Sequence, residues 1–321
     1  MDQNSLETRL GSMKLQYPIM NGAGSCGATI EKVRRLAENA EIGAVVVGPM
    51  TVKLRPINSG NVFDTRDPNF TVNSLGLPND GEEPIKERLP HLVEICHDNG
   101  KKLIVTQPGF CLDDYVRLAE AAAKAGADAI ECNTSCPNVW DDQHQHEILC
   151  FVLDQLRATM LAVQARVGGS INIGMKVSPY SNPLALDRVA RMVRDDLNIQ
   201  FITTMNTYPN ALSLDEDCKP VLDKMVLGGM GGKAVKPMNL GAVYQINKVF
   251  KGDHNHRPTQ TQIVAVGGID SGLDVLHYES CGATAFQVTS AFLDEPANDR
   301  GEGNPAIFGR ILAEYLELKN K

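Results

Sequence analysis

A cysteine between two asparagines is the first feature of this sequence that could carry chemistry. Cys136 stands in the segment NTSCPN (133–138), three residues after the end of the short run AIECN (129–133). A free cysteine is most often a small buried side chain. A thiol on a loop can instead act as a general acid or base when its pKa is lowered. The segment is therefore compatible either with a packed thiol or with one that moves a proton.

Several asparagines and one lysine also lie near the ends of apolar runs or in the segments between them. Lys176 ends the apolar run INIGMK, where it is either solvated or a cation that stabilises an anionic ligand. An asparagine alone is typical of a turn, but a converging set both donates and accepts, which suits a planar ring with alternating N–H and C=O groups. The asparagines that we expect to converge are Asn73, Asn133, Asn138 and Asn206.

Two further segments, VGGID (266–270) and VTSA (288–291), resemble phosphate-binding turns. Gly267 and Gly268 allow backbone N–H groups to approach an anion closely, and the hydroxyls of Thr289 and Ser290 can add donors. One glycine pair alone is typical of a tight turn. Because both loops occur together in the expected register, phosphate binding is the favoured interpretation.

The elements that position these residues alternate between short apolar runs and longer stretches of helical period, which predicts a parallel sheet with helical crossovers. The expected strands are Pro18–Asn21, Ala44–Val47, Leu103–Thr106, Ala129–Asn133, Gly174–Val177, Phe201–Met205, Gln262–Val266 and Ala285–Val288. The expected helices include Ile30–Asn39, Asp113–Ala125, Glu147–Val167, Leu184–Asp195, Leu240–Phe250, Gly272–Ser280 and Ala306–Leu318.

This pattern predicts an α/β fold, a (β/α)8 TIM barrel, whose functional groups lie at the carboxyl ends of the strands. A doubly wound sheet is the competing fold, since GAGSCG (22–27) has dinucleotide-type spacing, but the second strand lacks the acid that this fingerprint needs. We expect a single domain, 1–321, with two insertions, at about 52–82 and 208–237, that lie over one barrel face.

Composition narrows the class of protein. The net charge of −8 argues against a nucleic-acid partner or an anionic membrane surface, and no run is long and apolar enough for a membrane span. The eight cysteines form no CxxC pair, so we expect no metal site and a reducing, cytoplasmic location.

The motifs PIMNGAG, VNSLGLPN, NTSCPN, GMKVSPY, GGMGG, VGGIDSG and CGATAFQV resemble, in this order, those of class 1 dihydroorotate dehydrogenases. The resemblance extends from about Leu15 to Leu318. It implies an FMN-dependent oxidoreductase of pyrimidine biosynthesis that acts on a CH–CH bond. The 1A class is cytoplasmic and homodimeric, oxidises dihydroorotate to orotate by hydride transfer to flavin N5, and passes electrons to a soluble acceptor such as fumarate.

The resemblance also implies roles for individual residues, with Cys136 as the catalytic base. The residues expected to bind FMN are Gly22, Ala23, Gly24, Asn133, Lys176, Gly231, Gly232, Gly267, Gly268, Thr289 and Ser290. Those expected to bind the substrate are Asn73, Leu75, Gly76, Leu77, Asn133, Asn138, Asn206 and Thr207.

Three positions depart from the family pattern. Gly48 stands where the family has a lysine near flavin and substrate, and Lys53, Arg55 and Arg66 are the nearby cations that could replace it. The loop after NTSCPN differs from Trp140 onward, and Thr289 replaces a glycine, which predicts crowding of the phosphate loop. Two alternatives therefore stay open: a relative that acts on another cyclic amide, pyrimidine-like or conjugated carbonyl compound, and a flavin-binding protein without turnover.

Overall fold

The computed structural model describes residues 6–137, 147–293 and 303–321, and its centre is a closed barrel of parallel strands. The barrel order is β3-β4-β7-β8-β9-β10-β13-β14, with β14 closing on β3, so the predicted (β/α)8 barrel is confirmed. The strands are β3 (Ile19–Asn21), β4 (Ala44–Val47), β7 (Lys102–Gln107), β8 (Ala129–Asn133), β9 (Asn172–Val177), β10 (Phe201–Thr204), β13 (Gln262–Val266) and β14 (Ala285–Val288).

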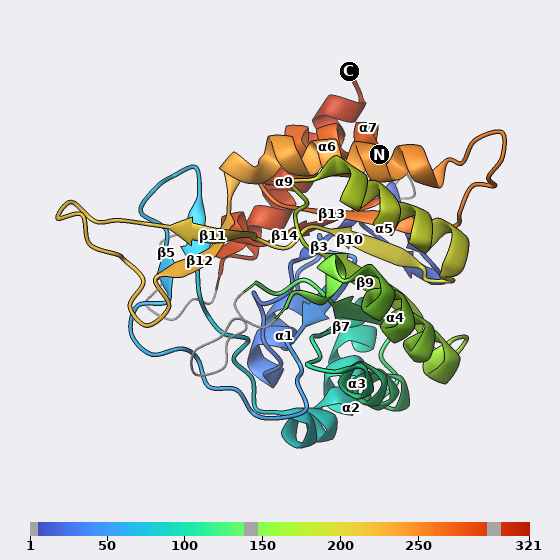
Figure 1. Ribbon diagram of the computed structural model, residues 1–321, viewed down its shortest axis with the longest axis horizontal. Helices are drawn as coiled ribbons and strands as arrows, with labels where there is room; N and C mark the ends of the chain where they lie inside the picture. The colour runs from blue at the N-terminus through green and yellow to red at the C-terminus, as the bar shows by residue number, and fades with distance from the viewer. Residues whose placement is uncertain (1–5, 138–146, 294–302) are drawn as a thin grey trace.

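Helices surround the barrel on its outside (Figure 1). They are α1 (Ile30–Ala37), α2 (Glu82–Asp98), α3 (Leu112–Lys124), α4 (Leu153–Val167), α5 (Pro183–Asp196), α6 (Lys236–Phe250), α7 (Gly272–Cys281) and α9 (Ala306–Lys319). The short helix α8 (Ser290–Leu293) follows β14 at the carboxyl end of the barrel. The expected helix Glu147–Val167 is shorter than predicted, because a separate 3-10 turn, η2 (Leu149–Phe151), precedes α4. None of the described helices is both long and apolar enough to cross a bilayer.

Local sequence signals explain where several helices begin. The Asn182 side chain accepts a hydrogen bond from Leu184 N, and Pro183 occupies the first turn of α5, where its missing N–H costs nothing. Ser271 and Asp274 form a reciprocal capping box at the start of α7. These caps fix the turns that lead from the barrel strands into the helices.

A hairpin closes the amino end of the barrel. It consists of β1 (Thr8–Leu10) and β2 (Met13–Leu15), and its turn is bonded to the beginnings of two barrel strands through Asn172 and Gln262. Its buried side chains complete an apolar floor inside the barrel. Each fully buried Leu or Met there contributes roughly 1.5–3 kcal/mol. The floor comprises Leu10, Met13, Leu15, Met20, Ala44, Val46, Ile104, Ala129, Phe201, Val264 and Ala285.

The two insertions combine into one antiparallel sheet beside the carboxyl end of the barrel, as Figure 1 shows on its left side. Its order is β11-β12-β6-β5, from β5 (Phe63–Asp64), β6 (Thr71–Asn73), β11 (Tyr208–Leu212) and β12 (Leu227–Gly231). The central pair, β6 and β12, joins the insertions, with Asn73 opposite Gly229. The sheet therefore brings Asn73 to the barrel mouth.

Candidate active site

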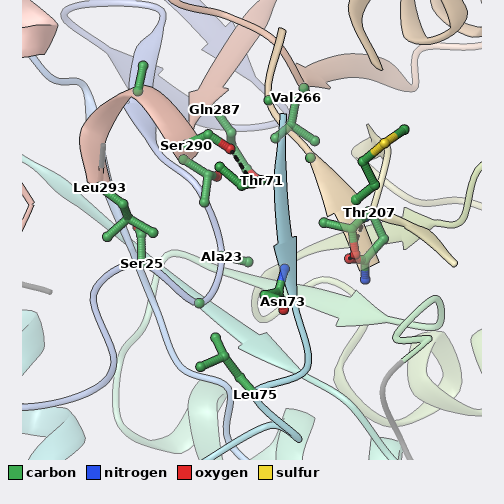
Figure 2. Close-up of a pocket in the computed structure, with 18 of the residues that line it drawn as sticks. Ala23, Ser25, Thr71, Asn73, Leu75, Thr207, Val266, Gln287, Ser290 and Leu293 are labelled. Carbon is green, nitrogen blue, oxygen red and sulfur yellow. Dashed lines mark hydrogen bonds between the residues drawn. The ribbon is translucent and has the colours of Figure 1, made fainter. Parts of the chain in front are cut away.

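A cavity of about 770 Å³ lies at the carboxyl ends of the barrel strands, between the barrel and the added sheet. Figure 2 shows side chains from both parts around it, among them Ala23, Gln287 and Asn73. The predicted site residues that line it are Ala23, Gly24, Asn73, Leu75, Gly76, Leu77, Asn133, Cys136, Lys176, Asn206, Thr207, Gly231, Gly232, Gly267, Gly268, Thr289 and Ser290. Gly22 lies behind this wall, and Asn138 and Trp140 fall outside the described residues.

Three of the four asparagines that were predicted to converge, Asn73, Asn133 and Asn206, line this cavity. Asn206 Nδ2 donates to Asn133 Oδ1 at 3.3 Å and to Ser135 Oγ at 3.1 Å. Asn206 Oδ1 accepts from the backbone N–H of Thr207 at 2.8 Å. Asn73 approaches from the added sheet and donates to Gly229 O at 3.4 Å. These contacts fix the amide orientations before any ligand binds.

Cys136 is half-buried and lines the same cavity, while several other thiols are inert. Burial raises the pKa of both Cys26 and Cys132 to about 12 and that of Cys150 to about 11, so these three stay protonated at neutral pH. Cys136 also borders a second cavity of about 350 Å³, between the loop before α3 and the start of α4. Cys136 is the candidate proton acceptor because it lines the cavity and, unlike these three buried thiols, is only half-buried.

Lys176 supplies a buried positive charge to the cavity. Its residue is only 5% exposed, and no hydrogen bond or ion pair joins its ammonium group to any described residue. Burial lowers the pKa of Lys176, and the neighbouring Glu131 and Cys136 act in the opposite direction. An unpaired buried ammonium is costly, so this position favours a ligand that brings negative charge.

The predicted phosphate end of the cavity has the expected glycines and hydroxyls. Gly267 and Gly268 have φ values of 117° and 68°, a conformation that few other residues adopt. The hydroxyls of Thr71 and Ser290 also line the cavity and lie 3.4 Å apart, within hydrogen-bonding distance of each other (Figure 2). This end therefore offers backbone and hydroxyl donors together.

The Thr289 side chain packs against Gly22 as well as facing the predicted phosphate end of the cavity. A Cβ added to Gly22 would lie 1.8 Å from Thr289 Oγ1. Thr289 still lines the cavity, but part of its side chain fills the gap left by the glycine. The predicted crowding thus falls partly on Gly22, the residue directly after β3.

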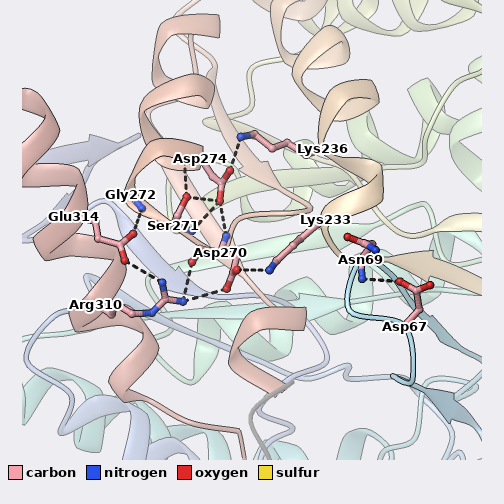
Figure 3. A network of polar contacts seen from close by, with 10 residues as sticks. All are labelled: Asp67, Asn69, Lys233, Lys236, Asp270, Ser271, Gly272, Asp274, Arg310 and Glu314. Carbon is pink, nitrogen blue, oxygen red and sulfur yellow. Dashed lines mark hydrogen bonds and ion pairs between the residues drawn. The ribbon is translucent and has the colours of Figure 1, made fainter.

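A charged network that the sequence pattern did not single out holds the turn after β13 (Figure 3). Lys233 pairs with Asp270 at 2.8 Å, and Arg310 donates to the side chain and the carbonyl of Asp270 at 3.1 and 2.9 Å. Arg310 also pairs with Glu314, whose other oxygen accepts from Gly272 N. The network fixes the loop that carries Gly267 and Gly268.

None of the three cations near Gly48 in sequence replaces the family lysine. Arg55 donates to Gly76 O and lies over the Phe110 ring, while Arg66 pairs with Asp64. Neither these two nor Lys53 lines the cavity. Instead Lys32, from α1, does, together with Lys176, Lys233 and Arg310.

Other lining residues were missed for a simple reason. Thr71 precedes Asn73 by two positions on β6, so strand alternation places both on one face. Gln287 follows the same rule at the end of β14, two residues before Thr289. The alternation of side chains along a strand could have predicted both residues, but only once the ends of β6 and β14 are known.

The fold and the site define an enzyme of the (β/α)8 barrel class that handles a small molecule at the carboxyl ends of its strands. The chain belongs to the dihydroorotate dehydrogenase family, whose family model matches residues 5–299. This confirms the resemblance. Members of the family are FMN-dependent oxidoreductases that act on CH–CH bonds, as predicted for this chain.

Individual relatives fall into more than one named type. A dihydroorotate dehydrogenase (fumarate) of Trypanosoma brucei brucei is 27% identical over 319 residues, 98% of this chain and 93% of the relative. The catalytic subunit of a dihydroorotate dehydrogenase B (NAD(+)) of a Geobacter species is 29% identical over 328 residues, 100% and 96% of the two chains. The crystal structure of an Eimeria tenella enzyme of this name, in complex with ferulenol, has a similar fold, with a TM-score of 0.77 at 19% identity, covering 98% and 84%.

Proposed function

We propose that this chain binds FMN in the cavity at the barrel mouth. The observation that carries the proposal is the buried ammonium of Lys176, which pairs with no residue that the structure describes and suits the electron-rich N1–C2 carbonyl edge of a flavin. An added Cβ on Gly24 would meet nothing within 4 Å, so this wall leaves open space beside the cavity. Gly231, Gly232, Gly267, Gly268, Thr289 and Ser290 would hold the ribityl phosphate.

Dihydroorotate is the favoured substrate, and orotate its product. When bound, FMN would accept a hydride from one carbon of the substrate CH–CH bond. Cys136, as thiolate, removes the proton from the adjacent carbon, and the electron pair left behind forms the new C=C bond. Asn73, Asn133, Asn206 and Thr207 donate to and accept from the ring amide groups, which holds the reacting carbon near the thiol.

Lys176 would place its ammonium group beside the bound FMN, where a positive charge would stabilise the electron-rich edge of the flavin. Leu75 and Leu77, from the segment that follows β6, provide apolar walls that limit water at the reacting atoms. A 1A-type enzyme with a soluble acceptor such as fumarate, working as a cytoplasmic homodimer of single-domain chains, fits the full-length similarity to the fumarate-named relative.

A second candidate is the oxidation or reduction of a cyclic amide that lacks the carboxylate. Gly48 favours it, because no lysine there can meet such a group. The backbone itself excludes a simple replacement: Gly48 has a φ of 112°, and a Cβ would lie 2.6 Å from Thr106 O. Gly48→Lys is therefore expected to strain the loop and not to restore a contact.

The test is an FMN titration of the purified protein followed by an anaerobic screen. We expect stoichiometric FMN binding and loss of the flavin's visible absorbance with dihydroorotate. Bleaching by dihydrouracil in preference to dihydroorotate would support the second candidate. Bound FMN that no cyclic amide reduces would indicate a flavin-binding protein without turnover, and failure to bind FMN would overturn the proposal.

A further inference from the structure

A polar layer lies directly above the apolar floor of the barrel. Ile104, Ala129, Phe201 and Ala285 belong to the floor, and side chains two positions further along a strand point to the same side. Those positions hold Thr106, Glu131, Thr203 and Gln287, all no more than 1% exposed. The layer therefore contains one carboxyl group in the centre of the barrel.

Glu131 is held by donors from three other strands. Its Oε1 accepts from Thr106 Oγ1 at 3.3 Å, and its Oε2 accepts from Thr203 Oγ1 at 2.7 Å and from Gln287 Nε2 at 2.8 Å. Both carboxyl oxygens of Glu131 therefore have hydrogen-bond donors, and all three donors belong to the polar layer.

Lys176 belongs to the same region of the barrel. It follows Gly174 by two positions, and Gly174 faces the interior, since a Cβ there would meet the Phe201 ring at 2.0 Å. In strand register Lys176 lies beside Thr203, which binds Glu131, and beside Asn133, which lines the cavity. No hydrogen bond or ion pair joins Lys176 to Glu131 among the contacts of the described residues, so their interaction acts through space.

We propose that Glu131 is a positioning residue whose buried carboxylate keeps the Lys176 ammonium charged and oriented toward the cavity. Glu131 itself is absent from the cavity wall, whereas Lys176 is part of it. The donors from Thr106, Thr203 and Gln287 satisfy the carboxylate, so it does not need to draw Lys176 down into direct contact. The ammonium group stays available for the ligand while its countercharge lies below. The inference rests on the proposed function in that FMN is the ligand that Lys176 would meet.

The test compares the pH dependence of FMN affinity in the wild type, Glu131→Gln, Lys176→Gln and the double variant. The titratable groups acting on Lys176 are Glu131 and Cys136. Without Glu131, the burial that lowers the pKa of Lys176 is no longer opposed by this carboxylate. In Glu131→Gln the ammonium should lose its proton at lower pH, and the affinity should then fall up to tenfold for each further pH unit.

The wild-type affinity should begin to fall at a higher pH than the affinity of Glu131→Gln, because Glu131 opposes the lowering of the Lys176 pKa by burial. The double variant should show no additional pH dependence over Lys176→Gln alone. Glu131→Asp, which keeps the charge, should restore the wild-type profile in part. Glu279→Gln, which removes an acid on α7 that pairs with Lys319, is the matched control and should behave as the wild type.

A folded Glu131→Gln protein with the wild-type pH profile would overturn the proposal. If this variant does not fold, ¹³C NMR of the Lys176 side chain in wild-type protein, assigned with Lys176→Gln, decides the question. A Lys176 side chain that is charged at pH 7 supports the role of Glu131, whereas one that is neutral at pH 7 contradicts it. The NMR result is independent of turnover, so it separates this inference from a failure of the proposed function.

Discussion

Asn206 Nδ2 lies 3.3 Å from Asn133 Oδ1, so the last residue of β8 and a residue just after β10 are joined directly at the cavity wall. The same Nδ2 contacts Ser135 Oγ, and the other amide atom of Asn206 accepts from Thr207 N. Because both ends of the amide are held, its orientation is preorganised. A ligand can therefore bind to the remaining hydrogen-bonding positions without reordering the wall.

Asn206→Ala should weaken substrate binding while FMN stays bound. Losing about one net hydrogen bond corresponds to roughly a tenfold higher KM. Steady-state kinetics, with FMN content measured in parallel, checks this. The matched control is Asn99→Ala, which removes an exposed amide at the carboxyl end of α2, on the opposite side of the barrel, whose side chain donates to Ile95 O. Equal losses in both variants would show that Asn206 acts through general stability.

Gly22→Ala should destabilise the protein through Thr289. The added Cβ would lie 1.8 Å from Thr289 Oγ1, so the threonine must leave its position, at a cost of about 1–3 kcal/mol. Denaturant unfolding measures this cost, and Thr289→Gly in the same chain should recover most of it. Gly241→Ala, on α6 with nothing within 4 Å of the new Cβ, is the control and should be neutral or slightly stabilising. Equal stability of the two alanine variants would rule out the contact.

Acid should weaken the added sheet through Asp64. Hydrogen bonds from Arg66 hold the pKa of Asp64 at about 2, below its ordinary 3.8. A lowered carboxyl pKa stabilises the fold above about pH 4, and this stabilisation is lost as the pH falls toward 2. For a pair near the surface we expect about 1 kcal/mol. Asp64→Asn should remove this part of the pH dependence, as should Arg66→Met; an unchanged slope between pH 4 and pH 2 would contradict the assignment.

The alternation of apolar and helical segments was enough to predict the barrel, because each β-strand is a short buried run with a clear end. Gln262–Val266 and Ala129–Asn133 have the predicted bounds. The helix α2 was not singled out, since it contains Pro90 within its span and its apolar face is weakly separated from the polar one. The pairing of β6 with β12 joins residues far apart in sequence, so no local pattern could predict it.

The candidate site was predictable where residue type alone suggests a role, as for Lys176 and the asparagines. Lys233 and Arg310 were missed because they reach Asp270 from different segments, and only the fold brings them together. Glu131 was missed for another reason. It lies within an apolar strand, and its importance comes from donors on three other strands.

The central claim is that Cys136 removes the substrate proton, and single-turnover kinetics tests it most directly. Wild-type protein loaded with FMN is mixed anaerobically with dihydroorotate, and loss of the flavin absorbance is followed for wild type, Cys136→Ala and the control Cys111→Ala. Cys111 is exposed and borders the second cavity but does not line the cavity at the barrel mouth. We predict a rate about 10²–10⁴-fold lower for Cys136→Ala, with FMN binding and the Cys111→Ala rate unchanged. A Cys136→Ala rate equal to that of the wild type would show that another group is the base.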